Sequence, residues 1–204
     1  MWQGAAAANC ALSAGVFGRG RRVRVTRVMT PSRFATARLT LLPLHVEHAE
    51  EMAGVLDDPA LHTFIGGAPD TVDELRNRYR RMLAGSPDPG VDWLNWVVQL
   101  RADTSLVGTV QATVSDGVAE LAWVVGVPWQ GRGIATEAAR GLVAWLGERG
   151  VRELRAHIHP EHRASAAVAA ACGLGPTGRW RDDGEADWGR GLSGRPAGPS
   201  GSCR

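Results

Sequence analysis

The amino-acid sequence predicts an α/β (α+β) domain with a single mixed, mostly antiparallel twisted sheet flanked by helices. Segments whose apolar residues recur at strand spacing alternate with segments at helical spacing, in the order β-α-α-β-β-β-α-β-α-β-β. Gly, Pro and Asp gather between these segments, as at 57–59, 85–90 and 182–184. A length of 204 residues accommodates one domain of ordinary size.

Strands are expected at 37–44, 93–101, 106–114, 120–127 and 153–159, with a last hairpin over 179–190. Only short polar segments separate the strands between 91 and 127, so these three should be consecutive and antiparallel. Helices are expected at 45–56, 72–84, 133–149 and 165–172. Thr71 and Glu74 are spaced as a capping box at the start of the second helix.

The charges are distributed unevenly along the chain. The formal net charge is +2, and every basic residue apart from histidine is Arg. Residues 1–30 and 190–204 contain eight arginines and no acidic residue, so the body between them is net negative. An acidic body suits a cationic substrate such as an amine better than a phosphate backbone. Nucleic-acid binding is therefore not expected, since the arginines lie outside the core with few aromatic residues among them.

The two ends of the chain are predicted to be disordered. We assign residues 1–33 to an N-terminal extension, 34–190 to the folded domain, and 191–204 to a Gly/Pro/Ser-rich tail. Met1 and Met29 both stay open as the natural start. The apolar part of the extension precedes its arginines, the reverse of a secretory signal, and no apolar run reaches the length of a membrane span. Three scattered cysteines without CxxC spacing are compatible with a reducing compartment, so a cytoplasmic location is expected.

The segment 130–135 (QGRGIA) joins a predicted strand to a predicted helix. The first amides of a helix have no acceptor within it, and together with the helix dipole they bind phosphate oxygens. Gly131 and Gly133 let a ligand approach the backbone, while Gln130 and Arg132 add side-chain donors. The spacing matches neither the P-loop nor GxGxxG. On spacing alone, a pyrophosphate site and an ordinary helix entry both remain open.

Residues 36–189 resemble the GNAT superfamily of N-acetyltransferases, in particular its RimJ/RimL-like branch. The family turn Arg/Gln-x-x-Gly-x-Gly/Ala appears here as Gln130, Gly133 and Ala135. Residues 36–52 (TARLTLLPLHVEHAEEM) are similar to the first strand and helix of that branch, and 159–178 (HPEHRASAAVAAACGLGPTG) to its last helix and the turn after it. The resemblance implies a GNAT-like acyl-CoA N-acyltransferase fold.

The resemblance also implies acetyl-CoA as co-substrate and no metal. Backbone groups of Val125, Gly126 and Val127 would pair with the pantetheine arm. The pyrophosphate would be held by the turn and the first helical residues, which are Gln130, Gly131, Arg132, Gly133, Ile134, Ala135 and Thr136. His162 stands where many members have a cofactor-binding Asn.

Proton transfer is the less certain part of the chemistry, because an ammonium of pKa about 10 must lose a proton before it attacks a thioester. Glu120, at the start of a strand where related enzymes often place a Glu, is the candidate base; the alternative is a solvated strand-end carboxylate. The usual acid is a Tyr in the last helix, but Ala169 occupies that position and the only Tyr is Tyr79. Ser165 is a substitute acid or, alternatively, a helix N-cap.

The remaining chemistry-bearing residues have structural interpretations. His157 and His159 share a strand face and could bind a metal with Glu161, but an ordinary strand is favoured. Cys172 is expected to pack in the core. Four tryptophans could line an acceptor pocket or belong to the core: Trp93, Trp96, Trp123 and Trp129.

The function predicted from these observations is transfer of acetyl from acetyl-CoA directly to a primary amine in a ternary complex. The acceptor would enter between the first two helices and the sheet, near 62–67 and 85–92. A protein N-terminus, a free amino acid, an antibiotic and a polyamine all remain open as acceptors, and so do a monomer and a homodimer. Because the usual Tyr and Asn are missing, a non-catalytic acyl-CoA-binding module is the alternative.

Overall fold

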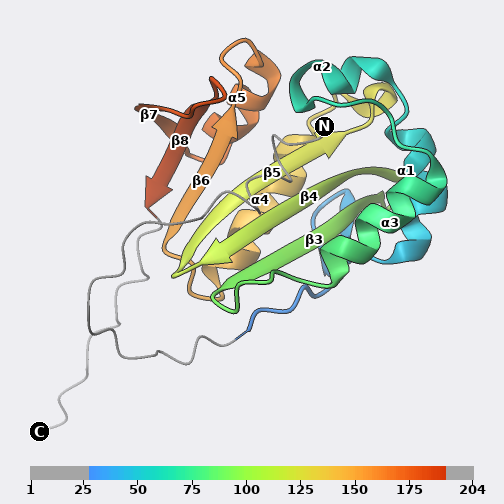
Figure 1. Ribbon diagram of the computed structural model, residues 1–204, viewed down its shortest axis with the longest axis horizontal. Coiled ribbons are helices and arrows are strands. Elements are labelled where there is room, and N and C mark those ends of the chain that lie inside the picture. The colour runs from blue at the N-terminus through green and yellow to red at the C-terminus, as the bar shows by residue number, and fades with distance from the viewer. Residues whose placement is uncertain (1–27, 192–204) are drawn as a thin grey trace, which may run out of the picture.

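The computed structural model describes residues 28–191. Within them, eight strands form one sheet in the order β1-β2-β3-β4-β5-β6-β8-β7 (Figure 1). The strands are β1 Phe34–Ala35, β2 Leu39–Pro43, β3 Val91–Leu100, β4 Leu106–Ser115, β5 Val118–Val125, β6 Glu153–Ile158, β7 Gly175–Trp180 and β8 Ala186–Gly191. The pairs are antiparallel except for β5 and β6. The predicted fold class is confirmed.

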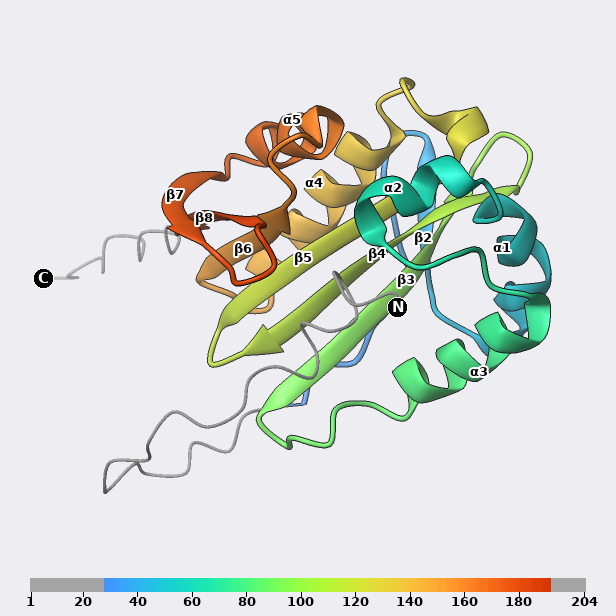
Figure 2. The same cartoon turned by 45° about the horizontal axis from the view of Figure 1, so that its top comes forward.

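Helices cover both faces of the sheet (Figures 1 and 2). They are α1 Ala49–Val55, α2 His62–Ile65, α3 Val72–Leu83, α4 Ile134–Gly147 and α5 Arg163–Ala171, with short 3-10 turns at Val46–His48, Pro59–Leu61 and Val127–Trp129. Helices α4 and α5 pack over one face and α1 and α3 over the other. Successive side chains of β3 point to opposite faces of the sheet. Trp96 and Val98 pack in the core on the side of α4 and α5, and Val97 packs in the core on the side of α1 and α3. None of the described helices is long and apolar enough to cross a membrane.

Several predicted boundaries need correction. Ser32 falls in the expected extension, but its carbonyl and hydroxyl accept hydrogen bonds from the indole N–H groups of Trp96 and Trp145, both at 3.0 Å, so the domain includes it. Strand β1 was not predicted, because two residues carry no periodicity. Helix α5 begins before Ser165, and the N-cap is His162 instead, whose ring accepts a long 3.5 Å bond from the Ser165 amide. The rest of both expected tails, 1–27 and 192–204, lies outside the described residues.

The only parallel pairing in the described sheet, between β5 and β6, sets the position of the site. It runs from Val118 opposite Glu153 to Glu120 opposite Arg155, and no further. Beyond that point β6 pairs with β8 on its other side, while β5 continues along β4. The two strands therefore separate just after Glu120, and the next part of the β5 backbone edge faces an opening.

Candidate functional site

A cleft of about 370 Å³, here called the main cleft, lies where β5, the start of α4 and α5 meet. Many of the residues expected to bind a cofactor line it together with Ser165: Val125, Gln130, Gly131, Gly133, Ile134, Ala135, Thr136 and His162. Gly126, Val127 and Arg132 do not line it. The structure thus brings together residues from two segments that are about thirty positions apart in sequence.

The turn before α4 presents main-chain donors to this cleft. Gly131 and Gly133 have φ of +70° and +73°, a left-handed conformation that favours glycine. The first intrahelical bond is from the Glu137 amide to the Gly133 carbonyl, at 3.0 Å. The amides of Ile134, Ala135 and Thr136 therefore have no acceptor within α4, and they carry the positive end of the helix dipole. This is the local geometry that binds a phosphate.

The loop between β1 and β2 holds this turn in place, a feature that the sequence patterns did not reveal. Glu137, in the first turn of α4, accepts hydrogen bonds from the Thr36 hydroxyl and the Arg38 amide, and it forms a 2.6 Å ion pair with the Arg38 guanidinium. Burial opposes its ionisation, but these contacts outweigh burial and lower the pKa of Glu137. Arg38 also donates to the Arg132 carbonyl at 3.1 Å, which ties the turn to the start of β2.

The edge of β5 offers fewer main-chain groups than expected. The Gly126 amide donates to Val107 at 3.0 Å, on the β4 side, so that donor is not available in the cleft. Since successive amides alternate along a strand, the N–H groups of Trp123 and Val125 point toward the opening. The Val125 carbonyl already accepts a 3.0 Å bond from the Gln130 side chain. Of the expected residues Val125, Gly126 and Val127, Val125 therefore keeps an amide that faces the opening, and the amide of Trp123, which was not expected, faces it as well.

A second opening, the strand cleft, has a volume of about 70 Å³ and lies between β5 and β6. Glu120, His157 and Glu185 line it. It shares five lining residues with the main cleft, so the two adjoin: Phe64, Trp123, Val124, His162 and Ser165. A reactive group bound in the main cleft can thus come close to the carboxylates of the strand cleft.

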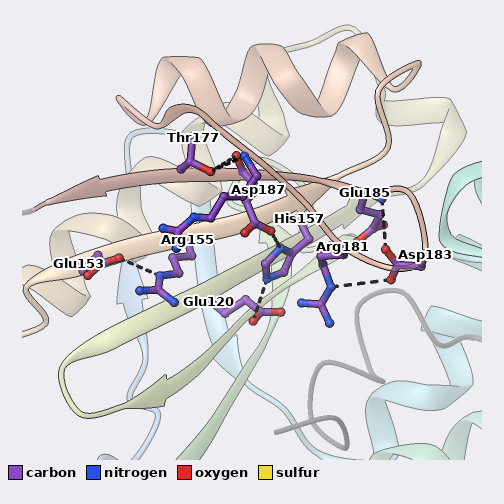
Figure 3. A network of polar contacts seen from close by, with 10 residues as sticks. Glu120, Glu153, Arg155, His157, Thr177, Arg181, Asp183, Glu185 and Asp187 are labelled. Atoms are coloured by element: carbon purple, nitrogen blue, oxygen red, sulfur yellow. Dashed lines mark hydrogen bonds and ion pairs between the residues drawn. The ribbon is translucent and has the colours of Figure 1, made fainter. Parts of the chain in front are cut away.

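Glu120 is not a freely solvated strand-end carboxylate. Its Oε2 lies 3.1 Å from Nε2 of His157, and the other ring nitrogen, Nδ1, lies 2.8 Å from Oδ1 of Asp187 (Figure 3). The three side chains are 27%, 11% and 28% exposed. Burial lowers the pKa of His157, but the hydrogen bond and charge of Glu120 more than offset burial, and the net shift is upward.

His162 combines cleft contacts with an aromatic stack. Its ring stacks on Phe64 of α2 at a centroid distance of 4.3 Å, and this contact joins α2 to the start of α5. Burial and the nearby His159 lower the pKa of His162, so the ring is neutral near pH 7. With Nδ1 accepting from Ser165, the proton lies on Nε2, which can donate to a ligand.

The other candidates fall into structural roles or lie elsewhere. Within residues 28–191 no three metal-ligating side chains are grouped to hold an ion. Trp96 is buried in the core, Trp123 and Trp129 line the main cleft, and Trp93 lines neither cleft. Cys172 is buried in the core as predicted, and burial raises the pKa of its thiol. Of the expected acceptor walls, Phe64 of α2 lines both clefts. His62 lines a separate pocket of about 20 Å³ between α1, α3 and the sheet, which Tyr79 also lines, and 85–92 lines none of the three.

Comparison with known proteins identifies the family and the fold of the chain. A family model described as "Acetyltransferase (GNAT) domain" matches residues 38–175. Among solved structures, RimL, a ribosomal L7/L12 alpha-N-protein acetyltransferase in complex with coenzyme A, matches with a TM-score of 0.66 and 15% identity over 77% of this chain and 96% of its own. The search of curated proteins gives no match.

Two further structures show the same fold. The spermidine N-acetyltransferase of Vibrio cholerae, in complex with CoA and spermine, matches with a TM-score of 0.65 and 16% identity over 78% of this chain and 98% of its own. A GNAT-family acetyltransferase of Bacillus anthracis matches with a TM-score of 0.65 and 19% identity over 79% and 98%. At these identities the likeness is one of fold.

Proposed function

Because the chain belongs to the GNAT family of acetyltransferases, we propose that it transfers the acetyl group of acetyl-CoA to a primary amine by direct attack in a ternary complex. The observation that carries the proposal is the main cleft, in which a glycine turn and the first amides of α4 lie beside the separated edge of β5. The bound thioester supplies an activated acetyl carbon and a thiolate leaving group.

The residues present fit a CoA molecule. The amides of residues 134–136 and the open backbone at Gly131 would bind the pyrophosphate, and the N–H groups of Trp123 and Val125 would bind the amide groups of pantetheine. His162 would donate from Nε2. A Cβ at Gly131 would meet no atom within 4 Å, so the space above the turn is open for a ligand. The positive φ, not crowding, is what requires glycine here.

The strand cleft would receive the amine. Glu120 and Glu185 place two carboxylates there, which favours a cationic acceptor. RimL and the spermidine enzyme act on a protein and on a polyamine, and we keep the proposal at the level of a primary amine. Glu120 would take the amine proton, directly or through a water. Ser165 lines both clefts and is the remaining candidate acid for the leaving thiolate.

An acetyl-CoA turnover screen across amines, read by release of free thiol, tests the proposal. The set should span a peptide N-terminus, free amino acids, polyamines and aminoglycosides. We expect sustained release with at least one amine, and a loss of about a hundredfold or more in kcat for Glu120→Gln. Glu153→Gln is the control, because this carboxylate pairs with Arg155 at 2.7 Å and does not line either cleft.

The binding-only alternative rests on the position of the sole Tyr. Tyr79 lies on α3 and lines neither cleft, so no Tyr is placed to protonate a thiolate. Binding of acetyl-CoA without thiol release for any amine would establish that alternative. Catalysis without a dedicated acid remains chemically reasonable, since a thiolate leaves readily (a thiol pKa is about 8.5).

A further inference from the structure

Three side chains from three strands meet beside the strand cleft. Glu120 comes from β5, His157 from β6 and Asp187 from β8, and the imidazole lies between the two carboxylates (Figure 3). Glu120 is the last residue of β5 that pairs with β6, and its side chain contacts His157 just beyond the point where the two strands separate. Both residues line the strand cleft together with Ser165 and His162.

The two distances restrict where protons can be. A neutral imidazole has one N–H and one lone pair, so it can donate to only one of two carboxylates. We assign the N–H of the neutral ring to Nδ1, because its contact with Asp187 Oδ1, at 2.8 Å, is the shorter of the two. The 3.1 Å contact between Nε2 and Glu120 Oε2 then becomes a hydrogen bond only when one proton is present between these two atoms. The arrangement therefore has a place for a single additional proton.

We propose that Glu120 and His157 act together as one proton acceptor, with Asp187 as the positioning residue that fixes the imidazole. The inference rests on the proposed function and adds a route for the proton. An N–H bond of the substrate ammonium breaks, the proton reaches Glu120, and it moves on to Nε2 of His157. The second proton, lost from nitrogen as the C–N bond forms, neutralises the departing thiolate. After turnover the stored proton returns to solvent.

The surroundings of His157 make this pair a stronger base than a carboxylate alone. An isolated Glu has a pKa of about 4.3, roughly six units below that of an amine substrate. Burial lowers the pKa of His157, Glu120 raises it, Arg181 lowers it and Asp187 raises it; Glu185 also interacts with the imidazole. The net shift is upward from the ordinary histidine value. Proton transfer from the ammonium is correspondingly less unfavourable.

A purely structural role is the competing explanation, since the same contacts would hold β6 to β5 and β8. The two explanations differ in how the reaction rate should respond to the titration of His157. A structural link changes stability only, whereas a proton acceptor makes the rate at low pH depend on the protonation of the imidazole. The experiment must therefore measure the pKa of His157 and the pH profile of kcat/KM in the same proteins.

The test uses the full chain with isotope-labelled histidine, titrated by NMR, alongside pH profiles of kcat/KM. In the wild-type protein we expect the Nδ1–H tautomer at high pH and an acidic limb whose apparent pKa equals that of His157. Asp187→Asn keeps the size of the side chain and removes its charge, so it should lower both pKa values together. His157→Gln should reduce kcat about a hundredfold or more and remove this limb.

Arg76→Gln is the control, because Arg76 lies on α3 and its ion pairs with Glu50 and Asp73 are outside the cluster and both clefts. It should leave the profile and the NMR titration unchanged. Calorimetry with acetyl-CoA on each variant separates a folded protein with impaired chemistry from a damaged fold.

The possible outcomes separate the two proposals. If the wild-type protein releases no thiol with any amine, the proposed function falls and the proton route falls with it. Turnover that stays within about threefold in His157→Gln overturns the proton route alone. Two other results would also overturn the proton route alone. One is an acidic limb of the kcat/KM profile that does not move in Asp187→Asn although the pKa of His157 does. The other is an Nε2–H tautomer of His157 at high pH.

Discussion

The turn before α4 and the cluster around His157 are built in opposite ways. The turn consists of consecutive residues that act mainly through main-chain groups, with left-handed glycines and the first amides of a helix. The cluster consists of three side chains from positions 120, 157 and 187, and it exists only because β5, β6 and β8 are neighbours in the sheet. Binding geometry can thus be local in sequence, whereas the proton chemistry depends on the whole topology.

The largest effect on acetyl-CoA binding should come from a substitution in the turn before α4. We expect Gly133→Glu to weaken acetyl-CoA binding by at least about a hundredfold, which corresponds to about 2.7 kcal/mol. Glutamate at φ +73° strains the turn, and its charge would repel the phosphates. Isothermal titration calorimetry measures the loss. Gly85→Glu is the control, since Gly85 has φ +80° with open space around it and lies outside both clefts. Unchanged affinity in Gly133→Glu would remove the turn from the site.

A smaller effect should result when the support of the turn is removed. Arg38→Gln breaks the ion pair with Glu137 and the bond to the Arg132 carbonyl, so the turn is less well held. We expect acetyl-CoA to bind about tenfold more weakly, by analogy with residues that orient ligands from behind. Arg76→Gln serves as the control, because it also removes an arginine from ion pairs, in this case with Glu50 of α1 and Asp73 of α3, but lies outside the turn. Equal affinities in the two variants would show that the turn holds its shape alone.

The same contrast explains what the sequence could and could not reveal. Gln130, Gly131 and Gly133 are close together in sequence, so the turn between a strand and a helix could be located from the sequence. Its interpretation as a ligand-binding turn needed the family resemblance as well, because the spacing alone also fits an ordinary helix entry. Nothing in the sequence placed Asp187 opposite His157. That pairing requires the order β6-β8-β7 in the sheet, in which β8 and not β7 is the neighbour of β6.

Errors at the element ends have a similar origin. His162 is a predicted cofactor residue, but its ring also caps α5. Ser165 was expected as the cap, because Ser is a preferred residue at helix N-termini. Gly126 was expected to bind a ligand, but its amide belongs to the pairing with β4. Sequence patterns predicted most of the strands and helices, though not β1 or α2, and they began the last hairpin at 179, whereas β7 begins at Gly175. The direction of each hydrogen-bonding group required the register.

The cluster should also change how stability depends on pH. The pKa of His157 is raised in the folded state, so its contribution to stability is fully present below the unfolded value of about 6.5 and is lost as pH rises through the folded pKa. Urea unfolding of the wild-type protein and His157→Gln should therefore differ more at pH 6 than at pH 9. A difference that is constant with pH would mean that the imidazole does not gain a proton on folding.

The smallest predicted effect concerns Tyr79 on α3, the only tyrosine of the sequence. Its hydroxyl is buried and has no hydrogen-bond partner among the protein groups of residues 28–191, and burial raises its pKa. An unpaired buried hydroxyl costs free energy, so Tyr79→Phe should raise the free energy of unfolding by about 1 kcal/mol. Because Tyr79 lines neither cleft, kcat should not change. Both quantities should be measured in the one variant. A fall in kcat with unchanged stability would make Tyr79 the candidate acid in place of Ser165, and would mean that α3 approaches the acetyl group during turnover.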